Sequence, residues 1–216
     1  MCIRDSECVP YPDGAPTAAT ADVPSMPPLP FLAQYTPAQP KISLSSNYSL
    51  PVDLLANPDV QYATIFMSHQ YGDLLVVRAK AFTSPDTRAG ESPSTQSEVE
   101  GWTVCNYNLA AGIANTCKLD HDIAIDDDGY YTLVVSTVDD RPTNATAEQG
   151  ATWFDWGPYL DNQITWRLFP RDNALIQALA ADVESGTTTL DQTPQAVYCD
   201  KETYESGGWT ACAAKA

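Results

Sequence analysis

Four of the six cysteines in this 216-residue chain lie as two close pairs, Cys105 with Cys117 and Cys199 with Cys212. The partners are 12 and 13 positions apart, a spacing that suits a disulfide closing a short loop. Disulfides persist in oxidising compartments and are rare in the cytoplasm. The cysteines therefore predict two local disulfides and an extracytoplasmic location, whether secreted, periplasmic or at the cell surface.

The N-terminal part of the chain is rich in proline. Nine prolines fall between residues 9 and 40, where each removes a backbone amide donor and favours extended backbone, so we predict a Pro-rich linker or arm. The opening hexapeptide, Met1 to Ser6, resembles translated sequencing-adapter sequence, and Cys2 is therefore given no weight. The first eight residues also lack the ordered regions of a signal peptide. Cys8 is left without an assigned partner.

Acidic residues far outnumber basic ones. The chain has 28 Asp and Glu against 11 Lys and Arg, for a formal net charge of −17. Affinity for nucleic acid comes chiefly from cationic contacts to phosphates, so this balance argues against a nucleic-acid partner. No stretch reaches the roughly 18 consecutive apolar residues of a membrane-spanning helix, so no membrane span is predicted. We interpret the acidic excess as a solvated surface.

From about residue 42 the chain changes to short β-branched and aromatic runs separated by turn residues, a pattern typical of an antiparallel sandwich or barrel. The first two runs are expected to form a hairpin at Tyr71 and Gly72. Asp126 to Gly129 has the composition of a tight turn. The segment between residues 107 and 118 is expected to be a loop that the first cysteine pair closes. The predicted strands are 60–70, 73–82, 99–107, 118–125, 130–138 and 163–169, with a short, irregular segment at 151–156.

One helix is predicted near residues 173–184. Asp172 or Asn173 can cap it, apolar residues recur at helical spacing within it, and Gly186 can end it. The fold class is therefore all-β, mainly an antiparallel sandwich, with one short C-terminal helix and a Pro-rich N-terminal arm. The predicted regions are 1–40 (artefactual start plus arm), 41–190 (β domain) and 191–216 (disulfide-pinned tail).

Four short motifs follow one another between residues 57 and 172. They are Trp102-Thr-Val-Cys-Asn-Tyr107, an Asp128-Gly129 turn into Tyr-Thr-Leu-Val-Val, Thr152-Trp-Phe-Asp-Trp156 and Arg167-Leu-Phe-Pro170. In this order they resemble a large family of uncharacterised bacterial proteins, which carries a W-S-x-x-x-Y strand, a D-G hairpin, a W-L-x-x-P segment and an R-x-Y-x-P strand. The chain departs from that pattern at Asp155 to Pro158, which displaces the expected proline, and at Phe169, which replaces the tyrosine. The resemblance implies a jelly-roll-like β domain and no established activity.

No catalytic signature stands out. There is no Gly-x-Ser-x-Gly elbow, and the two histidines, His69 and His121, are expected at a hairpin end and within a strand. A catalytic triad is therefore not predicted, and we favour a non-catalytic role. A purely structural domain of a larger envelope protein is a further alternative.

Clustered aspartates support a second hypothesis, a hydrolase or metal-dependent enzyme. In a strand, Asp120 and Asp122 would project to one face and His121 to the other. Asp126 and Asp128 offer hard oxygens that calcium accepts, although no closing glutamate follows as in an EF-hand, and a plain turn is the preferred interpretation. No other cofactor is implied. The carboxylates of this hypothesis are Asp120, Asp122, Asp126 and Asp128.

Aromatic residues are dense between Trp102 and Trp166. Trp166 alternates with polar neighbours and is expected in the core, whereas Trp153 and Trp156 fall in a Gly/Pro-flanked segment where flat faces could stack on a sugar. The scarce arginines could pair with a ligand carboxylate, or with an Asp in a buried ion pair. We predict a β domain that binds a glycan, a protein or a small anion through loop aromatics. The candidate ligand-binding residues are Trp153, Trp156, Tyr159, Arg141 and Arg167.

Overall fold

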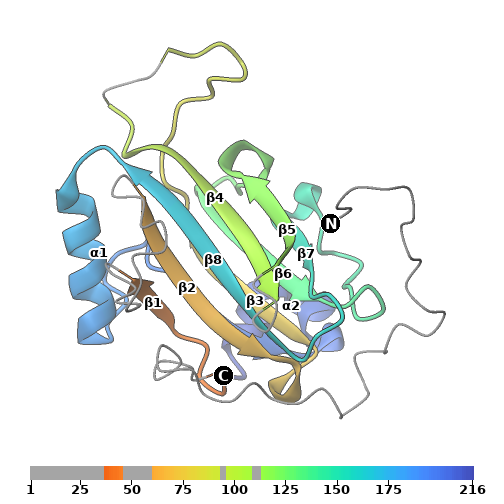
Figure 1. Cartoon of the computed structure of the whole chain (residues 1–216). Coiled ribbons are helices and arrows are strands. Elements are labelled where there is room, and N and C mark those ends of the chain that lie inside the picture. Colours follow the sequence, from red (N-terminus) through yellow and green to blue (C-terminus); the bar gives the residue numbers. More distant parts are fainter. Residues whose placement is uncertain (1–36, 46–59, 93–95, 109–112) are drawn as a thin grey trace, which may run out of the picture.

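The computed structural model describes residues 37–45, 60–92, 96–108 and 113–216. Within these ranges the chain forms nine strands in two sheets and two α-helices (Figure 1). The predictions for Met1 to Ser6, Cys8 and most of the Pro-rich segment lie outside the described residues. The strands are β1 (Ile42–Ser45), β2 (Gln61–Ser68), β3 (Leu74–Lys80), β4 (Val99–Asn108), β5 (Ile113–Leu119), β6 (Tyr130–Ser136), β7 (Ala151–Asp155), β8 (Asp161–Pro170) and β9 (Gln195–Cys199), and the helices are α1 (Asn173–Ser185) and α2 (Lys201–Ala213).

The two sheets enclose the main core between them. One is five-stranded in the order β1-β2-β8-β4-β5 and antiparallel, and the other is four-stranded in the order β7-β6-β3-β9. In β8 the inward residues Ile164, Trp166 and Leu168 are buried, which confirms the prediction for Trp166. The predicted all-β sandwich is thus confirmed, with two helices.

The four-stranded sheet is apolar on both faces. In β3 the run Leu74 to Val77 alternates between two clusters, with Leu75 and Val77 in the main core and Leu74 and Val76 in a second cluster with Tyr204 of α2. A strand covered on both sides reads as a continuous apolar run rather than an alternating one. Helix α2 therefore packs on the face of this sheet that is turned away from the five-stranded sheet.

The predicted hairpin at Tyr71 and Gly72 was wrong. Strand β2 pairs with β1 and β8, whereas β3 pairs with β6 and β9, so the connection carries the chain from one sheet to the other. A single 3-10 turn, His69–Tyr71, makes this crossing. A Cβ on Gly72 would lie 3.0 Å from the Tyr198 Cβ, so the absence of a side chain allows β9 to approach.

The strand predicted at 118–125 lies earlier in the chain. Strand β5 occupies Ile113–Leu119, and a 3-10 turn, Asp120–Asp122, follows it, so His121 is not within a strand. As an exposed edge strand, β5 has no apolar run to reveal it, and the sequence pattern predicts a loop for all of it except Lys118 and Leu119. Cys105 and Cys117 are direct partners across β4 and β5 and are joined by a disulfide.

Residues 151–156 are more regular than predicted. Ala151–Asp155 form β7, which pairs in parallel with β6 from Thr132 to Ser136. The sheet is therefore mixed rather than wholly antiparallel. Phe154 faces the main core and Trp153 the second cluster, so this strand is also apolar on both faces.

Helix α1 matches the predicted helix. The Asp172 side chain caps it by accepting from the Ala174 and Leu175 amides, and Gly186 follows its last turn in the left-handed conformation. The helix lies beside β1 (Figure 1), and its Leu179 is buried in the main core.

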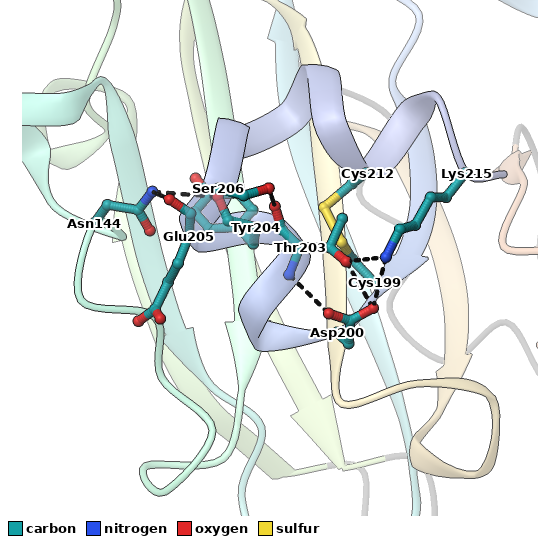
Figure 2. The surroundings of a disulfide bond; sticks show 9 residues. All are labelled: Asn144, Cys199, Asp200, Thr203, Tyr204, Glu205, Ser206, Cys212 and Lys215. Carbon is teal, nitrogen blue, oxygen red and sulfur yellow. Dashed lines mark hydrogen bonds and ion pairs between the residues drawn. A yellow bond between two sulfur atoms is a disulfide. The ribbon is translucent and has the colours of Figure 1, made fainter.

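The C-terminal segment, predicted as a disulfide-pinned tail, contains a strand and a helix. Strand β9 forms an edge of the four-stranded sheet, and α2 begins after the Asp200 cap and is interrupted by non-helical backbone at Gly207 and Gly208. The Cys199–Cys212 disulfide joins the end of β9 to the last turns of α2 (Figure 2). No helix within the described ranges is long and apolar enough to cross a membrane.

Candidate functional site

Trp156, the centre of the aromatic group predicted from the sequence, is inside the protein. Its side chain is 0% exposed, its indole Nε1 donates to the Tyr159 carbonyl at 3.0 Å, and its backbone amide donates to the Ser136 carbonyl at 2.7 Å. The His69 ring packs against the indole with ring centroids 4.1 Å apart. The prediction that Trp156 presents a face to a ligand is therefore corrected.

Side-chain amides fix the connection that follows Trp156. The Trp156 carbonyl accepts from Asn106, Asn115 and Asn162 at 3.2, 3.0 and 2.5 Å. Gly157 comes next with φ +83°, and a Cβ there would meet the Asn115 amide at 2.6 Å. This connection, residues 156–160, is thus held by buried hydrogen bonds.

The remaining predicted binding residues lie on different faces. Trp153 is half-buried on β7, and the Arg141 guanidinium lies 4.5 Å from its ring centroid in a cation–π contact. Arg167 is exposed on the outer face of the five-stranded sheet and donates to the Tyr107 hydroxyl at 3.0 Å. Tyr159 is half-buried beside Trp156. The structure does not bring these residues into one surface.

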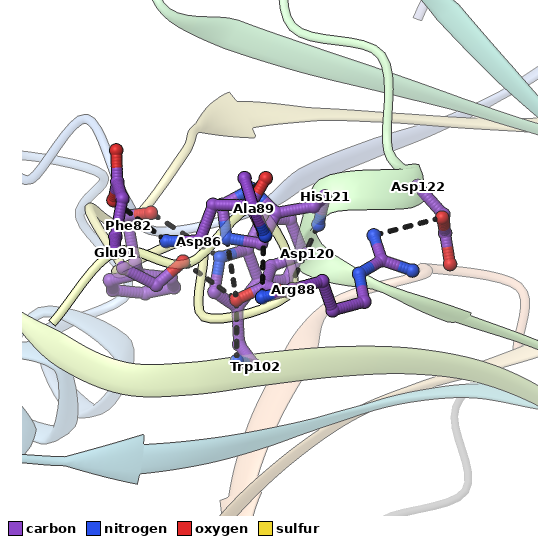
Figure 3. A network of polar contacts seen from close by, with 10 residues as sticks. Phe82, Asp86, Arg88, Ala89, Glu91, Trp102, Asp120, His121 and Asp122 are labelled. Carbon is purple, nitrogen blue, oxygen red and sulfur yellow. Dashed lines mark hydrogen bonds and ion pairs between the residues drawn. The ribbon is translucent and has the colours of Figure 1, made fainter. Parts of the chain in front are cut away.

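The aspartates of the enzyme hypothesis are engaged separately. Asp120 accepts from the Ser84 hydroxyl at 2.6 Å, and Asp122 pairs with Arg88 at 3.2 Å (Figure 3). Asp126 pairs with Arg78 at 2.6 Å, and Asp128 is exposed. In the part of the chain that the structure describes, no group of three or more His, Cys, Asp or Glu side chains could hold a metal ion.

Asp126 organises its turn. One carboxylate oxygen accepts from the Asp128 and Tyr130 amides, and the other accepts from Arg78. Burial raises the pKa of Asp126, but these hydrogen bonds have the larger, opposite effect and leave the pKa below its usual range. Both carboxylate oxygens of Asp126 are therefore engaged, one by the amides of the turn and the other by Arg78.

A polar pocket lies where three segments meet: the outer face of the four-stranded sheet, α2 and the connection between α1 and β9. Its volume is about 120 Å³. The side chains that give it chemical character are Arg78, Tyr130, Thr188, Asp191, Gln195 and Trp209.

Strand register places the sheet residues of this pocket together. Arg78 of β3 is paired with Thr132 on one side and with Gln195 of β9 on the other, and Tyr130 is the partner of Lys80. Residues directly opposite each other across paired strands share a face of the sheet. Because Val77 faces the main core, Arg78 and Gln195 face outward, toward the pocket.

Arg78 is held rigidly. Its guanidinium donates to Asp126 at 2.6 Å and to the Thr132 hydroxyl at 2.8 Å, and it lies 4.8 Å from the Tyr130 ring centroid. Arg78 and Asp126 are both about three-quarters buried, so solvent screens this ion pair less than a fully exposed one. The cation of the pocket therefore has a fixed position and a neutralising partner.

Asp182 positions the pocket's second wall. This α1 residue is 4% exposed and accepts from the Thr189 and Leu190 amides at 2.8 and 3.3 Å, and from the Thr193 hydroxyl at 2.5 Å. Burial raises the pKa of Asp182, but these hydrogen bonds outweigh it and hold the pKa well below its usual range. One buried carboxylate thus shapes the loop that carries Thr188 and Asp191.

Asp191 is docked onto the sheet. Its carbonyl accepts from the Lys80 amide at 2.8 Å, and its carboxylate lies 3.9 Å from the Lys80 ammonium. Burial, and then a hydrogen bond to the Asp191 carboxylate, raise the pKa of the Tyr130 phenol. Tyr130 is therefore a neutral donor beside a carboxylate acceptor.

Trp209 forms the wall contributed by α2. It is half-buried, follows the interruption at Gly207 and Gly208, and precedes Cys212 by one helical turn. The disulfide ties this turn to β9, which carries Gln195 (Figure 2). The bond thus connects two walls of the pocket.

The sequence pattern does not predict this pocket. Trp209 lies in a segment without a predicted strand or helix, and Arg78 lies within a predicted strand. One signal was present: Arg78 is the single charged residue in the apolar run from Leu74 to Ala79. A lone cation in a strand that is otherwise buried on both faces needs a polar partner, so it indicates a polar site on one face of the sheet.

Two bacterial crystal structures match this chain over part of their length. An uncharacterized protein from Burkholderia cenocepacia has 18% identity and a TM-score of 0.48, over 79% of this chain and 38% of that one. A protein from Vibrio parahaemolyticus has 15% identity and a TM-score of 0.38, over 67% and 33%. The chain therefore spans well under half the length of either protein. No protein-family model and no curated protein matches the chain, so the family resemblance of its motifs stays a prediction.

Proposed function

We propose that this chain is a disulfide-stabilised β-sandwich domain that works outside the cytoplasm and binds a small ligand in the pocket between α2 and the four-stranded sheet. The main observation behind this proposal is that one hollow is lined by aromatic, charged and amide side chains together. They are Trp209, Tyr130, Arg78, Asp191 and Gln195. Ligand sites characteristically combine aromatic walls with a few fixed polar groups. We keep the prediction that aromatic side chains bind a ligand, and we place the site in this pocket instead of at Trp153 and Trp156.

The polar groups of the pocket favour binding over catalysis. Arg78 is in an ion pair with Asp126, and the Tyr130 phenol has a raised pKa. A nucleophile needs an adjacent base to activate it, and these groups are instead arranged as fixed hydrogen-bond donors and acceptors.

The extracytoplasmic location rests on the two disulfides, Cys105–Cys117 and Cys199–Cys212. Peptide mapping without reduction, on protein exported to a bacterial periplasm, should recover both pairs. Recovery of free thiols at all four positions would contradict the proposed location.

A thermal-shift screen of neutral sugars, small anions and short peptides tests the binding function. A ligand at 100 times its Kd stabilises the folded state by about 2.7 kcal/mol, which raises the Tm of a chain of this length by about 5–10 °C. Trp209→Ala should abolish the shift, whereas Tyr71→Ala, which removes an exposed aromatic ring outside the pocket, should retain it. A shift lost in Trp153→Ala and retained in Trp209→Ala would place binding at the other aromatic group.

A further inference from the structure

We infer that the ligand of this pocket is an uncharged, polyhydroxylated unit the size of one pyranose ring. This inference rests on the proposed function and names the chemistry of the same site. It follows from the charge balance, the hydrogen-bonding groups and the volume of the pocket.

The charge balance disfavours an anion. Among the described residues that line the pocket, Arg78 is the only cation, and Asp126 neutralises it at 2.6 Å. Asp191 also lines the pocket, and its nearest cation, Lys80, is 3.9 Å away and about half exposed. An anionic ligand would therefore meet a carboxylate without a free cation, on a chain whose net charge is −17.

The hydrogen-bonding groups suit hydroxyls. The Asp191 carboxylate accepts, the guanidinium of Arg78 donates, and the Gln195 amide does both. A sugar hydroxyl donates and accepts at once, so a set of donors and acceptors within one small hollow matches adjacent hydroxyls better than it matches a carboxylate or an ammonium. Trp209 also lines the pocket, and its indole ring can contact a sugar ring that these polar groups bind.

The volume limits the size of the ligand. Ordinary ligand clefts have volumes of about 300–1,000 Å³, whereas this pocket has about 120 Å³. It can accept a single ring or the end of a chain, with the rest of a longer glycan in solvent. A peptide would need a longer groove or several side-chain pockets.

The experiment is a titration of the full chain, followed by tryptophan fluorescence, with glucose, galactose and mannose and with the matching uronates. At least one hexose should bind with a Kd on the order of 1 mM, as expected for so small a ligand, and its uronate should bind at least about tenfold more weakly. Trp209→Phe should weaken hexose binding and remove the fluorescence change.

The sign of the Asp191→Asn effect separates the two ligand classes. With an uncharged ligand this variant loses a charged acceptor, and affinity should fall about tenfold. With an anion it removes a repulsive charge, and affinity should rise. Asp128→Asn removes the same charge from an exposed position outside the pocket and should change affinity less than twofold.

The outcomes distinguish the two proposals. Stronger binding of a uronate, enhanced by Asp191→Asn and lost in Trp209→Phe, overturns the uncharged ligand and leaves the binding function standing. If Trp209→Phe does not alter hexose binding, the pocket is not the binding site, and the proposed function is overturned. No binding of any of the six probes up to about 100 mM overturns the inference, and the thermal-shift screen then decides whether another ligand occupies the pocket.

Discussion

Trp156 and Trp209 show two ways in which this chain holds a tryptophan in place. Trp156, in the connection between β7 and β8, is buried in the main core, and three asparagine amides bind its carbonyl. Trp209, in α2, stays half exposed, and its turn is tied to the sheet by the Cys199–Cys212 disulfide. A buried polar network closes a site, whereas a covalent tie at the edge of a helix can hold a wall in place and leave its surface open.

Trp156→Ala should have the largest effect on stability. Removing a fully buried indole leaves a cavity and should lower the free energy of unfolding by about 3–5 kcal/mol in urea titrations. Trp209→Ala, at a half-exposed position, is the control and should cost about 1 kcal/mol. Equal losses for the two variants would show that the two tryptophans contribute alike to stability, contrary to this prediction.

The two disulfides separate stability from binding. Replacing both members of either pair by Ala should cost about 3 kcal/mol, because the loops closed have similar lengths. Only the Cys199/Cys212 variant should also lose ligand-induced stabilisation, since Cys105 and Cys117 join strands of the other sheet. If the Cys105/Cys117 variant lost binding equally, the pocket would not depend on the C-terminal disulfide.

Asp182 should make part of the stability depend on pH. Its pKa is lowered in the folded state, so its contribution is fully present above the unfolded value of about 3.9 and is lost as the pH falls below it. Asp182→Asn should cost about 2 kcal/mol at pH 7 through weaker hydrogen bonds. Urea midpoints between pH 6 and pH 2.5 should fall less steeply in this variant than in the parent, and parallel curves would contradict the assignment.

Local patterns in the sequence predicted much of the fold. Trp166 in an alternating run, the Asp172 cap and the Asp126 to Gly129 turn are fixed by neighbours in the chain, and the structure contains all three. The cysteine pairs likewise join segments that are close in sequence.

Features that depend on distant partners were not predictable in this way. The crossing at Gly72 depends on which strands β2 and β3 pair with, and Trp156 packs in a core built from both sheets while its carbonyl is bound by Asn106 and Asn162 of other strands. A Gly/Pro-flanked segment looks like an exposed loop in sequence, and only tertiary hydrogen bonds reveal that it is not. The candidate pocket could not be predicted for the same reason, because Arg78 and Trp209 line one hollow only through the packing of α2 on the sheet.

The most direct test follows the indole N–H signals of the five tryptophans in a ¹H–¹⁵N spectrum of the full chain during titration with glucose, galactose and mannose. Single Phe variants assign the signals of Trp209, Trp156 and Trp153. The signal of Trp209 should shift with a bound sugar, whereas that of Trp156, which is hydrogen-bonded inside the protein, should stay in place. A shift confined to Trp153 or Trp156, with Trp209 unchanged, would contradict the assignment of the binding site to the pocket beside α2.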